Sequence, residues 1–384
     1  MPPTKSQPLK TLFSPLFAIM VEYESEMKKL EEEISTTKYN KRTQHAIGLL
    51  KAKLARLREQ QETRKRSVKK GEGYSVRRSG DATVILVGFP SVGKSTLLNA
   101  LTNAESKTAA YEFTTLDVVP GMLEYGHAKI QILDVPGVVK GASDGTGRGK
   151  EVLSIMRSAD MALILVEVTH PEHLDVLLNE IKSTNIRLNQ HKPYVKIRKT
   201  VRNGIRIGKT VKLRNLNDDT IKAILKEFRI NNADVLIREE INDDQLIDII
   251  EDNRIYMPRI IILTKADTVS QEKAEQVKKE IRADIIISAE KRSGLEELKR
   301  LIFDKLSLIR VFLKQPGKEA DMEIPLIMKK NCTIGDVCEK LHKDFVSKFK
   351  FARIWGASSK FPGQKLLSLD HVLLDKDVLE LHIR

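Results

Sequence analysis

Apolar runs alternate with helical patterns through the central part of this chain. These runs occupy residues 84–88, 121–125, 130–134, 161–168, 259–264 and 283–288. Uninterrupted apolar runs are typical of parallel strands whose two faces are both buried. Because such strands alternate here with helices, the pattern predicts an α/β sheet covered by helices on both faces.

Two helical patterns precede this region. An acidic one covers residues 22–35. A longer one covers residues 43–66, where the face opposite the apolar positions is rich in Lys and Arg. The apolar positions that recur at helical spacing are Met27, Leu30, Ile34, Ile47, Leu50, Leu54 and Leu57. We expect a basic helical hairpin and linker over residues 21–80, after a disordered extension over residues 1–20.

A basic segment interrupts the alternation of strands and helices. Residues 191–214 hold nine Lys/Arg and no acid, and apolar and basic residues alternate about the dipeptide Asn203-Gly204. Asn-Gly between alternating runs predicts a β-hairpin, here with one wholly cationic face. Helical patterns follow at residues 218–228 and 243–253. We therefore expect a β-then-α insertion over residues 191–255, within an α/β domain formed by residues 81–190 and 256–309.

The pattern changes again over residues 310–384. Strands are predicted at residues 311–315, 323–328, 353–355 and 378–383. A helix is predicted at residues 333–345, with Thr333 as its N-cap. This order indicates a small β-grasp-like domain with Trp355, the only tryptophan, in its core. Nothing in this domain indicates catalysis.

The composition indicates a soluble globular protein and a polyanionic partner. Of 384 residues, 41% are hydrophobic and 31% are charged, and the formal net charge is +14. Residues 1–80 alone hold 18 Lys/Arg against 9 Asp/Glu. Such a field attracts nucleic acid or an anionic membrane, although a plain solvated basic face remains an alternative. The basic helices lack exposed aromatic anchors such as Trp, which favours RNA or the ribosome over stable membrane association.

The cysteines and histidines show no familiar metal pattern. Cys332 and Cys338 are the only cysteines, and their spacing suits no common zinc motif, so a reduced, cytoplasmic location is the simplest interpretation. His170 and His173 flank a Pro-Glu pair. We assign them to a loop or helix start rather than to a metal site.

A phosphate-binding loop follows the first predicted strand. Residues 88–95, GFPSVGKS, have the G-x-x-x-x-G-K-S pattern and lead into a predicted helix. Glycines let the backbone wrap the phosphates, and its N–H groups and the helix N-terminus stabilise their charge. Lys94 would reach the β- and γ-phosphates, and the Ser95 hydroxyl would bind Mg²⁺.

Two further segments suit a GTPase switch. Residues 134–137, DVPG, end a predicted strand. Asp134 would hold the metal through a water, and the Gly137 amide would sense the γ-phosphate. Residues 113–115, FTT, lie between this motif and the phosphate loop. We take Thr115 as the second magnesium ligand.

The base-reading motif is TKAD, residues 264–267. The Asp267 carboxylate offers two acceptors that match the N1–H and N2–H₂ donors of guanine, which argues against an ATPase. Lys265 would pack across the base plane, and Ser288-Ala289-Glu290 would meet guanine O6 through its backbone. Thr264 stands where Asn is commoner, which puts one supporting hydrogen bond in question.

These motifs define the candidate site. Catalytic roles fall to Lys94, Thr115 and Gly137, and the metal ligands are Ser95, Thr115 and Asp134. The nucleotide-binding residues are Gly88, Phe89, Pro90, Ser91, Val92, Gly93, Lys94, Ser95, Thr96, Phe113, Thr114, Thr115, Asp134, Gly137, Thr264, Lys265, Asp267, Ser288, Ala289 and Glu290.

The motifs resemble those of the developmentally regulated GTP-binding proteins, an Obg-related branch of translation-associated GTPases. The resemblance rests on GFPSVGKST, EFTTLDVVPG, DVPGVVKGASDGTGRG, the basic insertion and the ending FPGQKLLSLDHVLLDKDVLELHIR. It implies a helical hairpin, a P-loop GTPase domain with an inserted S5-domain-2-like module, and a C-terminal TGS domain. It also implies slow GTP hydrolysis, ribosome association and a regulatory binding protein. We expect a monomer.

The group that activates the attacking water is open. Val138 occupies the position of the usual glutamine and has no polar atom to offer. In the resembling branch a hydrophobic residue is normal there. The alternatives are a K⁺ ion beside the phosphates near Ser91, a group supplied by the ribosome or RNA, and a residue of segment 140–150 such as Arg148. A scaffold with a structural, barely hydrolysed nucleotide is the competing function.

Overall fold

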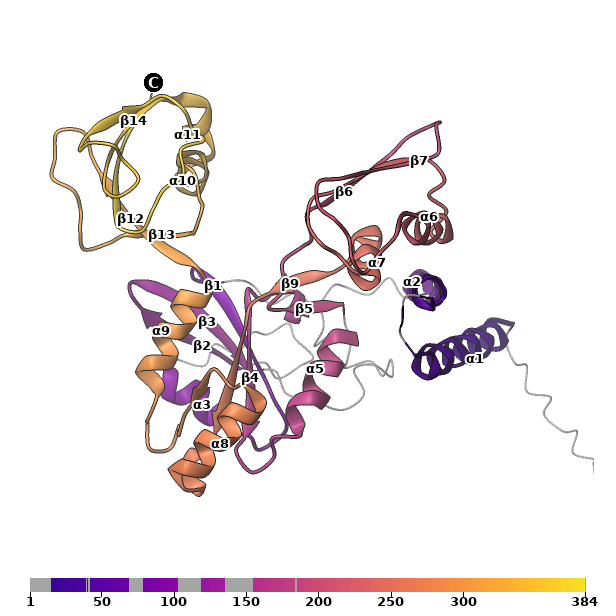
Figure 1. Ribbon diagram of the computed structural model, residues 1–384. Helices are drawn as coiled ribbons and strands as arrows, with labels where there is room; N and C mark the ends of the chain where they lie inside the picture. Colours follow the sequence, from indigo (N-terminus) through magenta and orange to yellow (C-terminus); the bar gives the residue numbers. More distant parts are fainter. Residues whose placement is uncertain are drawn as a thin grey trace, which may run out of the picture. The chain divides into compact units, whose positions relative to one another are not determined.

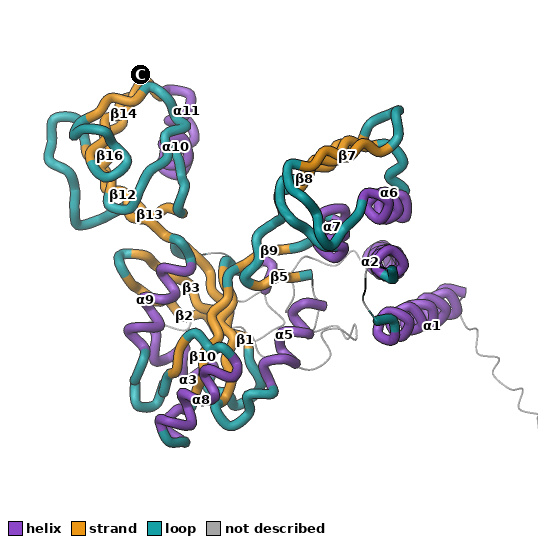
Figure 2. Tube along the Cα trace, in the orientation of Figure 1, coloured by secondary structure: helices purple, strands orange, loops and turns teal. Residues whose placement is uncertain are grey.

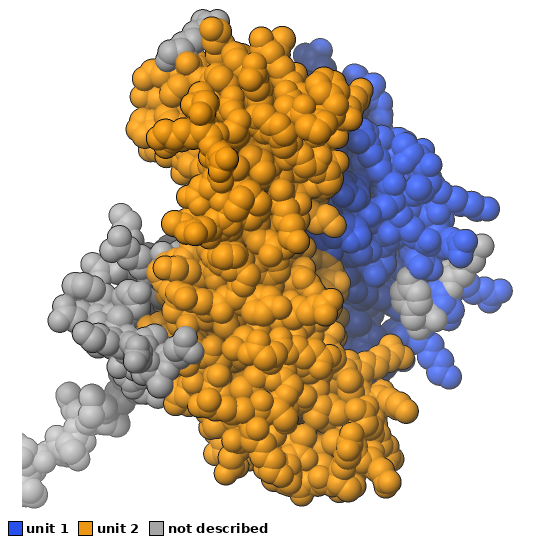
Figure 3. Space-filling model, turned by 90° about the vertical axis from the view of Figure 1, so that its left-hand side faces the viewer, with its two compact units in different colours: residues 1–72, 191–254 blue, residues 73–190, 255–384 orange. Residues whose placement is uncertain are grey.

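The computed structural model describes residues 15–38, 40, 42–68, 79–102, 119–134, 155–183 and 185–383, and it forms two compact units. Unit 1 comprises residues 1–72 and 191–254, and unit 2 comprises residues 73–190 and 255–384. Figure 3 shows unit 1 in blue and unit 2 in orange. The basic insertion therefore groups with the N-terminal helices rather than with the domain that it interrupts.

Unit 2 contains the predicted α/β sheet, in the order β11-β10-β4-β1-β3-β2 (Figure 1). Its strands are β1 (Ala82–Val87), β2 (Val119–Tyr125), β3 (Ala128–Asp134), β4 (Met161–Glu167), β10 (Arg259–Thr264) and β11 (Ile285–Ile286). All neighbours in this sheet are parallel except β2, which runs antiparallel to β3. The turn at Gly126 and His127 is too short for a crossover, so β2 returns beside β3.

Helices cover both faces of this sheet, as the pattern predicted. They are α3 (Lys94–Leu101), α5 (His173–Ser183), α8 (Gln271–Ile281) and α9 (Leu295–Lys305), with a 3₁₀ turn η1 (Ala266–Thr268). Strand β1 shows how two buried faces arise. Val84 and Leu86 pack with α3 and α9, whereas Ile85 and Val87 pack with α5 and α8. A short parallel pair of strands, β5 (Ile186–Leu188) and β9 (Ile255–Met257), lies where the chain leaves unit 2 for the insertion and where it returns.

The C-terminal part of unit 2 is a mixed sheet in the order β13-β12-β16-β14-β15. Its elements are β12 (Leu308–Lys314), β13 (Leu326–Lys329), α10 (Ile334–Leu341), α11 (Lys343–Lys348), β14 (Phe349–Trp355), β15 (Gln364–Leu366) and β16 (Asp377–Ile383). The Thr333 side chain caps α10 as predicted. The single predicted helix at residues 333–345 is wrong, because His342 is extended at φ −165° and starts α11 as a new N-cap. Trp355 is half-buried rather than in the core.

Unit 1 contains a three-stranded sheet that corrects the predicted hairpin (Figure 2). Strands β6 (Val195–Lys199) and β7 (Ile205–Lys209) do not pair with each other, because β8 (Ala233–Ile237) lies between them. Asn203 and Gly204 do turn the chain, both at positive φ. The face is not wholly cationic either, since Asp234 of β8 binds Arg206 at 2.7 Å. The helices α6 (Asp218–Glu227) and α7 (Asp243–Glu251) lie where they were predicted.

The N-terminal helices are α1 (Pro15–Thr36) and α2 (Gln44–Val68). The structure begins α1 inside the segment expected to be disordered, with Pro15 in the first turn, where its missing N–H costs no hydrogen bond. Leu30, Leu54 and Leu57 form the apolar contact between the two helices. None of the described helices combines the length and apolar character that a membrane crossing requires.

Helix α2 has a second buried face, which packs on the insertion. Ala52 is fully buried in the core formed by α6, α7 and β8. Lys51 Nζ lies 3.0 Å from carboxylate oxygens of both Asp243 and Asp244, and Arg56 lies 2.9 Å from Glu227. Two cations that the sequence assigned to a free basic face therefore bind acids of the insertion.

Candidate functional site

The phosphate-loop motif lies between β1 and α3, as predicted. A Cβ on Gly88 would come within 2.9 Å of both the Leu165 carbonyl oxygen and Val92 Cγ1, so the backbone must pass here without a side chain. Gly93 has φ +95°, a left-handed conformation that glycine adopts without strain. The loop therefore ends with the backbone turned into the start of α3.

Lys94 lies within its own loop. Its Nζ donates to the carbonyl oxygens of Gly88 and Phe89, both at 3.0 Å. Burial lowers the pKa of Lys94, and the negative charge of Asp134 opposes that shift. An ammonium held among carbonyls in this way can exchange them for phosphate oxygens.

Ser95 and Asp134 lie together, as the magnesium prediction requires. The Ser95 hydroxyl donates to Asp134 Oδ2 at 2.7 Å, and Asp134 is only 5% exposed. Among the described residues, the other carboxylate oxygen, Oδ1, is buried without a hydrogen-bond partner. A buried, unpaired carboxylate oxygen beside a hydroxyl is the hard oxygen donor set that Mg²⁺ prefers. These two residues fit the metal.

Thr264 connects the base-reading motif to the phosphate loop. Its buried hydroxyl lies 2.9 Å from the Val92 carbonyl oxygen and 3.2 Å from that of Val166. Thr264 stands where Asn is commoner, and its hydroxyl nevertheless forms a hydrogen bond that supports the phosphate loop. It fixes the end of β10 against the loop at the end of β1.

Asp267 and Ser288 join the two segments assigned to the base. The Ser288 hydroxyl donates to Asp267 Oδ1 at 2.6 Å and accepts from the Lys291 amide at 3.2 Å. The hydrogen bond from Ser288 is the main cause that lowers the pKa of Asp267. The carboxylate is thus held ionised, as an acceptor of guanine donors must be. Ala289 and Glu290 follow directly in the same loop.

Lys265, which we expect to pack across the base plane, forms an ion pair at the end of β4. Its backbone is left-handed at φ 57°, and its Nζ lies 3.1 Å from Glu167 Oε2 at the end of β4. Burial would raise the pKa of Glu167, but hydrogen bonds from Lys265 and Thr169 outweigh it and lower that pKa. No local pattern points to Glu167, because the pair joins the ends of two strands that lie about one hundred residues apart in the chain.

A second contact that the sequence missed lies on the phosphate loop. The Phe89 ring stacks on the His173 ring, with centroids 4.0 Å apart and planes inclined by 23°. His173 is the first residue of α5, so this helix supports the loop through a ring. Phe113, Thr114, Thr115, Gly137, Val138 and segment 140–150 with Arg148 lie outside the described residues.

Three family profiles match consecutive parts of the chain. A profile described as "50S ribosome-binding GTPase" matches residues 83–199, and one described as "C-terminal region of MMR_HSR1 domain" matches residues 202–308. A profile described as "TGS domain" matches residues 309–383. Together they extend from β1 to the end of the C-terminal sheet.

Similar proteins match along nearly the whole chain. An uncharacterized GTP-binding protein of Methanocaldococcus jannaschii is 50% identical over 94% of this chain and 93% of its own length. Developmentally-regulated GTP-binding protein 1 of Xenopus laevis is 41% identical, covering 92% of this chain and 97% of that protein. Developmentally-regulated GTP-binding protein 2 of Homo sapiens is 38% identical, with 92% and 98% covered.

Proposed function

The chain belongs to the family of developmentally regulated GTP-binding proteins, and from that premise we propose that it hydrolyses GTP to GDP and phosphate as a switch acting on the ribosome or RNA. The observation that carries the nucleotide part is the Thr264–Val92 hydrogen bond of 2.9 Å. It joins the loop for the phosphates to the strand that reads the base. A site built this way holds both ends of one guanine nucleotide.

The described residues divide the chemistry among them. Lys94 would leave its carbonyl partners for the β- and γ-phosphates, and the Gly93 amide and α3 N-terminus would stabilise the same charge. Ser95 and Asp134 would hold Mg²⁺, with Thr115 as a further ligand. When bound, Mg²⁺ neutralises charge that develops on the phosphates. Asp267 would select guanine over adenine because its two acceptors match two guanine donors.

Because Val138 cannot activate the attacking water, three sources of the activating group remain as alternatives. A K⁺ ion near Ser91 would add positive charge beside the phosphates. A ribosomal or RNA group would supply it only in the docked state. Arg148 would supply it from the chain itself. The backbone of Ser91 is left-handed at φ 62°, and this residue lies in an exposed turn of the loop.

The surface we propose for RNA is the exposed basic part of β6 and the turn that follows it. Lys196, Arg198, Lys199 and Arg202 are exposed there, and none of them forms an ion pair with another residue that the structure describes. Arg206 differs, because Asp234 already neutralises it. When uncompensated cations neutralise phosphates, the counterions held by the nucleic acid are released. Binding should therefore weaken steeply with salt.

Ribosome cosedimentation tests this role. The chain is loaded with GDP or with a non-hydrolysable GTP analogue and centrifuged with purified ribosomes at several salt concentrations. We expect tighter binding with the analogue, and weaker binding for Lys196→Glu/Arg198→Glu. The matched charge reversal Lys273→Glu/Lys279→Glu, on α8 of unit 2, should leave binding unchanged. Equal binding of both nucleotide forms would contradict the switch.

The remaining expectations complete the proposal. The protein works as a cytoplasmic monomer without stable membrane association, and a regulatory binding protein stabilises it. Sedimentation of the purified chain would test directly whether it is a monomer. A dimer at working concentration would overturn it.

A further inference from the structure

The turn between β4 and α5 places two histidines and a carboxylate side by side. Its sequence is His170-Pro-Glu172-His173. The His170 amide donates to the Glu167 carbonyl at 3.0 Å, and the His173 amide donates to the His170 carbonyl at 3.3 Å. These bonds fix the backbone before the helix begins. The three side chains therefore project from a turn that is already formed.

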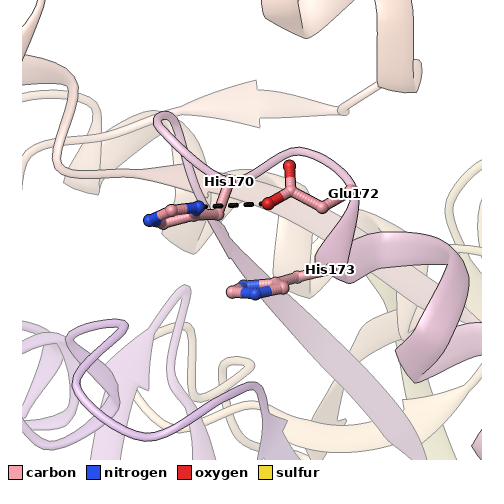
Figure 4. A group of neighbouring side chains, drawn as sticks. All are labelled: His170, Glu172 and His173. Carbon is pink, nitrogen blue, oxygen red and sulfur yellow. Dashed lines mark hydrogen bonds and ion pairs between the residues drawn. The ribbon is translucent and has the colours of Figure 1, made fainter.

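The three side chains also converge. His170 Nδ1 lies 3.1 Å from Glu172 Oε1, and the two imidazole rings stack with centroids 5.1 Å apart. One donor atom from each of the three residues lies within 4.8 Å of the others. Figure 4 shows the two rings one over the other, with the Glu172 carboxylate beside the His170 ring.

We propose that His170, Glu172 and His173 bind a divalent transition metal ion such as Zn²⁺ or Co²⁺ beside the phosphate loop. Two imidazoles and one carboxylate are a donor set that these ions prefer. Zinc bonds of about 2.0–2.1 Å place tetrahedral ligands roughly 3.4 Å apart. Because a ring nitrogen binds a metal in the plane of its ring, binding would turn at least one of the two stacked imidazoles towards the ion. His170 and Glu172 are 53% and 65% exposed, which gives the ion access from solvent.

This site differs from the proposed magnesium site in its residues and in its chemistry. Ser95 and Asp134 offer only oxygen donors, whereas this turn offers imidazole nitrogen, which Mg²⁺ rarely takes. Three protein ligands leave one position of a tetrahedral ion for water. None of the three residues takes part in the proposed GTP hydrolysis, so metal binding does not require that activity.

The ion would act on the phosphate loop through His173. This ring lies between Phe89, at 4.0 Å, and His170, at 5.1 Å. An ion that binds His173 would fix or rotate the ring on which Phe89 rests. If metal binding changes the affinity for nucleotide in this way, the nucleotide must change the affinity for metal by the same factor.

Metal titration of the full-length chain tests the proposal. The chain is saturated with GDP and excess Mg²⁺, which removes competition at Ser95 and Asp134, and Co²⁺ is added while its visible absorption is followed. We expect one equivalent to bind without the intense sulfur-to-metal bands that the buried thiols would produce. Calorimetry with Zn²⁺ should give the same stoichiometry.

Variants decide which residues are responsible. His170→Ala, His173→Ala and Glu172→Gln should each weaken the metal affinity by at least about tenfold. His191→Ala is the matched control, because His191 is an exposed histidine that pairs with Glu239 at 2.9 Å. Absence of saturable binding, or an unchanged affinity in His170→Ala/His173→Ala, would overturn the proposal. Because Glu172→Gln keeps the size of an exposed side chain, it separates loss of the ligand from loss of the fold.

Discussion

The Thr264 hydroxyl approaches the Val92 carbonyl oxygen at 2.9 Å and the Val166 carbonyl oxygen at 3.2 Å. A hydroxyl carries one hydrogen, so it donates to one of these oxygens at a time. The Val92 oxygen belongs to the phosphate loop, and Thr264 opens the base-reading motif. This single side chain therefore connects the two halves of the nucleotide site.

Thr264→Val removes that hydrogen bond while keeping the shape of the side chain. We expect nucleotide affinity to fall by about fivefold to tenfold, corresponding to roughly 1 kcal/mol for one buried hydrogen bond. Fluorescent GDP titration measures it. Thr264→Ser keeps the hydroxyl and should retain most of the affinity. An unchanged affinity in Thr264→Val, with a loss in Thr264→Ser, would mean that packing of the Thr264 methyl, not the hydrogen bond, matters.

Ser288→Ala removes the donor that orients Asp267 and lowers its pKa. We expect GTP affinity at neutral pH to fall by about tenfold, since a hydrogen bond to a charged group is lost. The pKa of Asp267 should also rise, so binding should fail at a higher pH as the solution is acidified. Ser293→Ala is the matched control, because Ser293 pairs with Ser288 through its backbone. An unchanged acid limit in Ser288→Ala would contradict this role.

Lys51→Ala should destabilise unit 1. The change leaves Asp243, whose side chain is 4% exposed, without its cation, which costs about 1–3 kcal/mol in the free energy of unfolding. Urea denaturation of the full chain measures the loss. Lys53→Ala removes an exposed pair with Glu26 and should cost less than about 1 kcal/mol. If the two variants lost the same stability, the Lys51 pairs would stabilise unit 1 no more than an exposed ion pair does.

Cys332 should be unreactive in the folded chain. Burial raises the pKa of its thiol from a usual 9.0 to about 11, so little reactive thiolate exists at pH 8. Maleimide labelling should proceed far more slowly in buffer than in guanidinium. As the pH rises, the thiol ionises in the unfolded chain before it ionises in the folded chain. The contribution of Cys332 to the free energy of unfolding is therefore complete below pH 9.0 and is lost towards about pH 11. Rapid labelling of native protein would refute the buried position.

Local patterns predicted much of the fold because local physics produces it. The runs at β1, β3, β4 and β10 are apolar on both faces, and only a sheet covered on both sides buries them. Thr333 is followed three residues later by Asp336, and this pair forms the predicted cap. The phosphate loop is likewise recognised from its own glycines and the helix that follows, although Thr264 and His173, distant in the sequence, also hold it.

Long-range pairing set the limit of prediction. The Asn203-Gly204 signal is genuine as a turn, yet β8 arrives from residues 233–237 and takes the place between the two basic strands. No pattern within α2 predicts that Ala52 is buried by α6 and α7, or that Lys51 pairs with acids about 190 residues later in the chain. The sequence around His173 indicates only a loop or a helix start, and the structure brings its ring to Phe89.

The most direct test of the central claim is multiple-turnover phosphate release from GTP, in potassium and in sodium buffer, with and without purified ribosomes. We predict slow release that ribosomes, potassium or both accelerate, because Val138 supplies no group for the attacking water. Stimulation by potassium alone would assign the missing charge to a cation near Ser91. Stimulation by ribosomes alone would assign it to the docked partner. No turnover under any of these conditions would contradict the GTPase and leave a scaffold with a structural nucleotide.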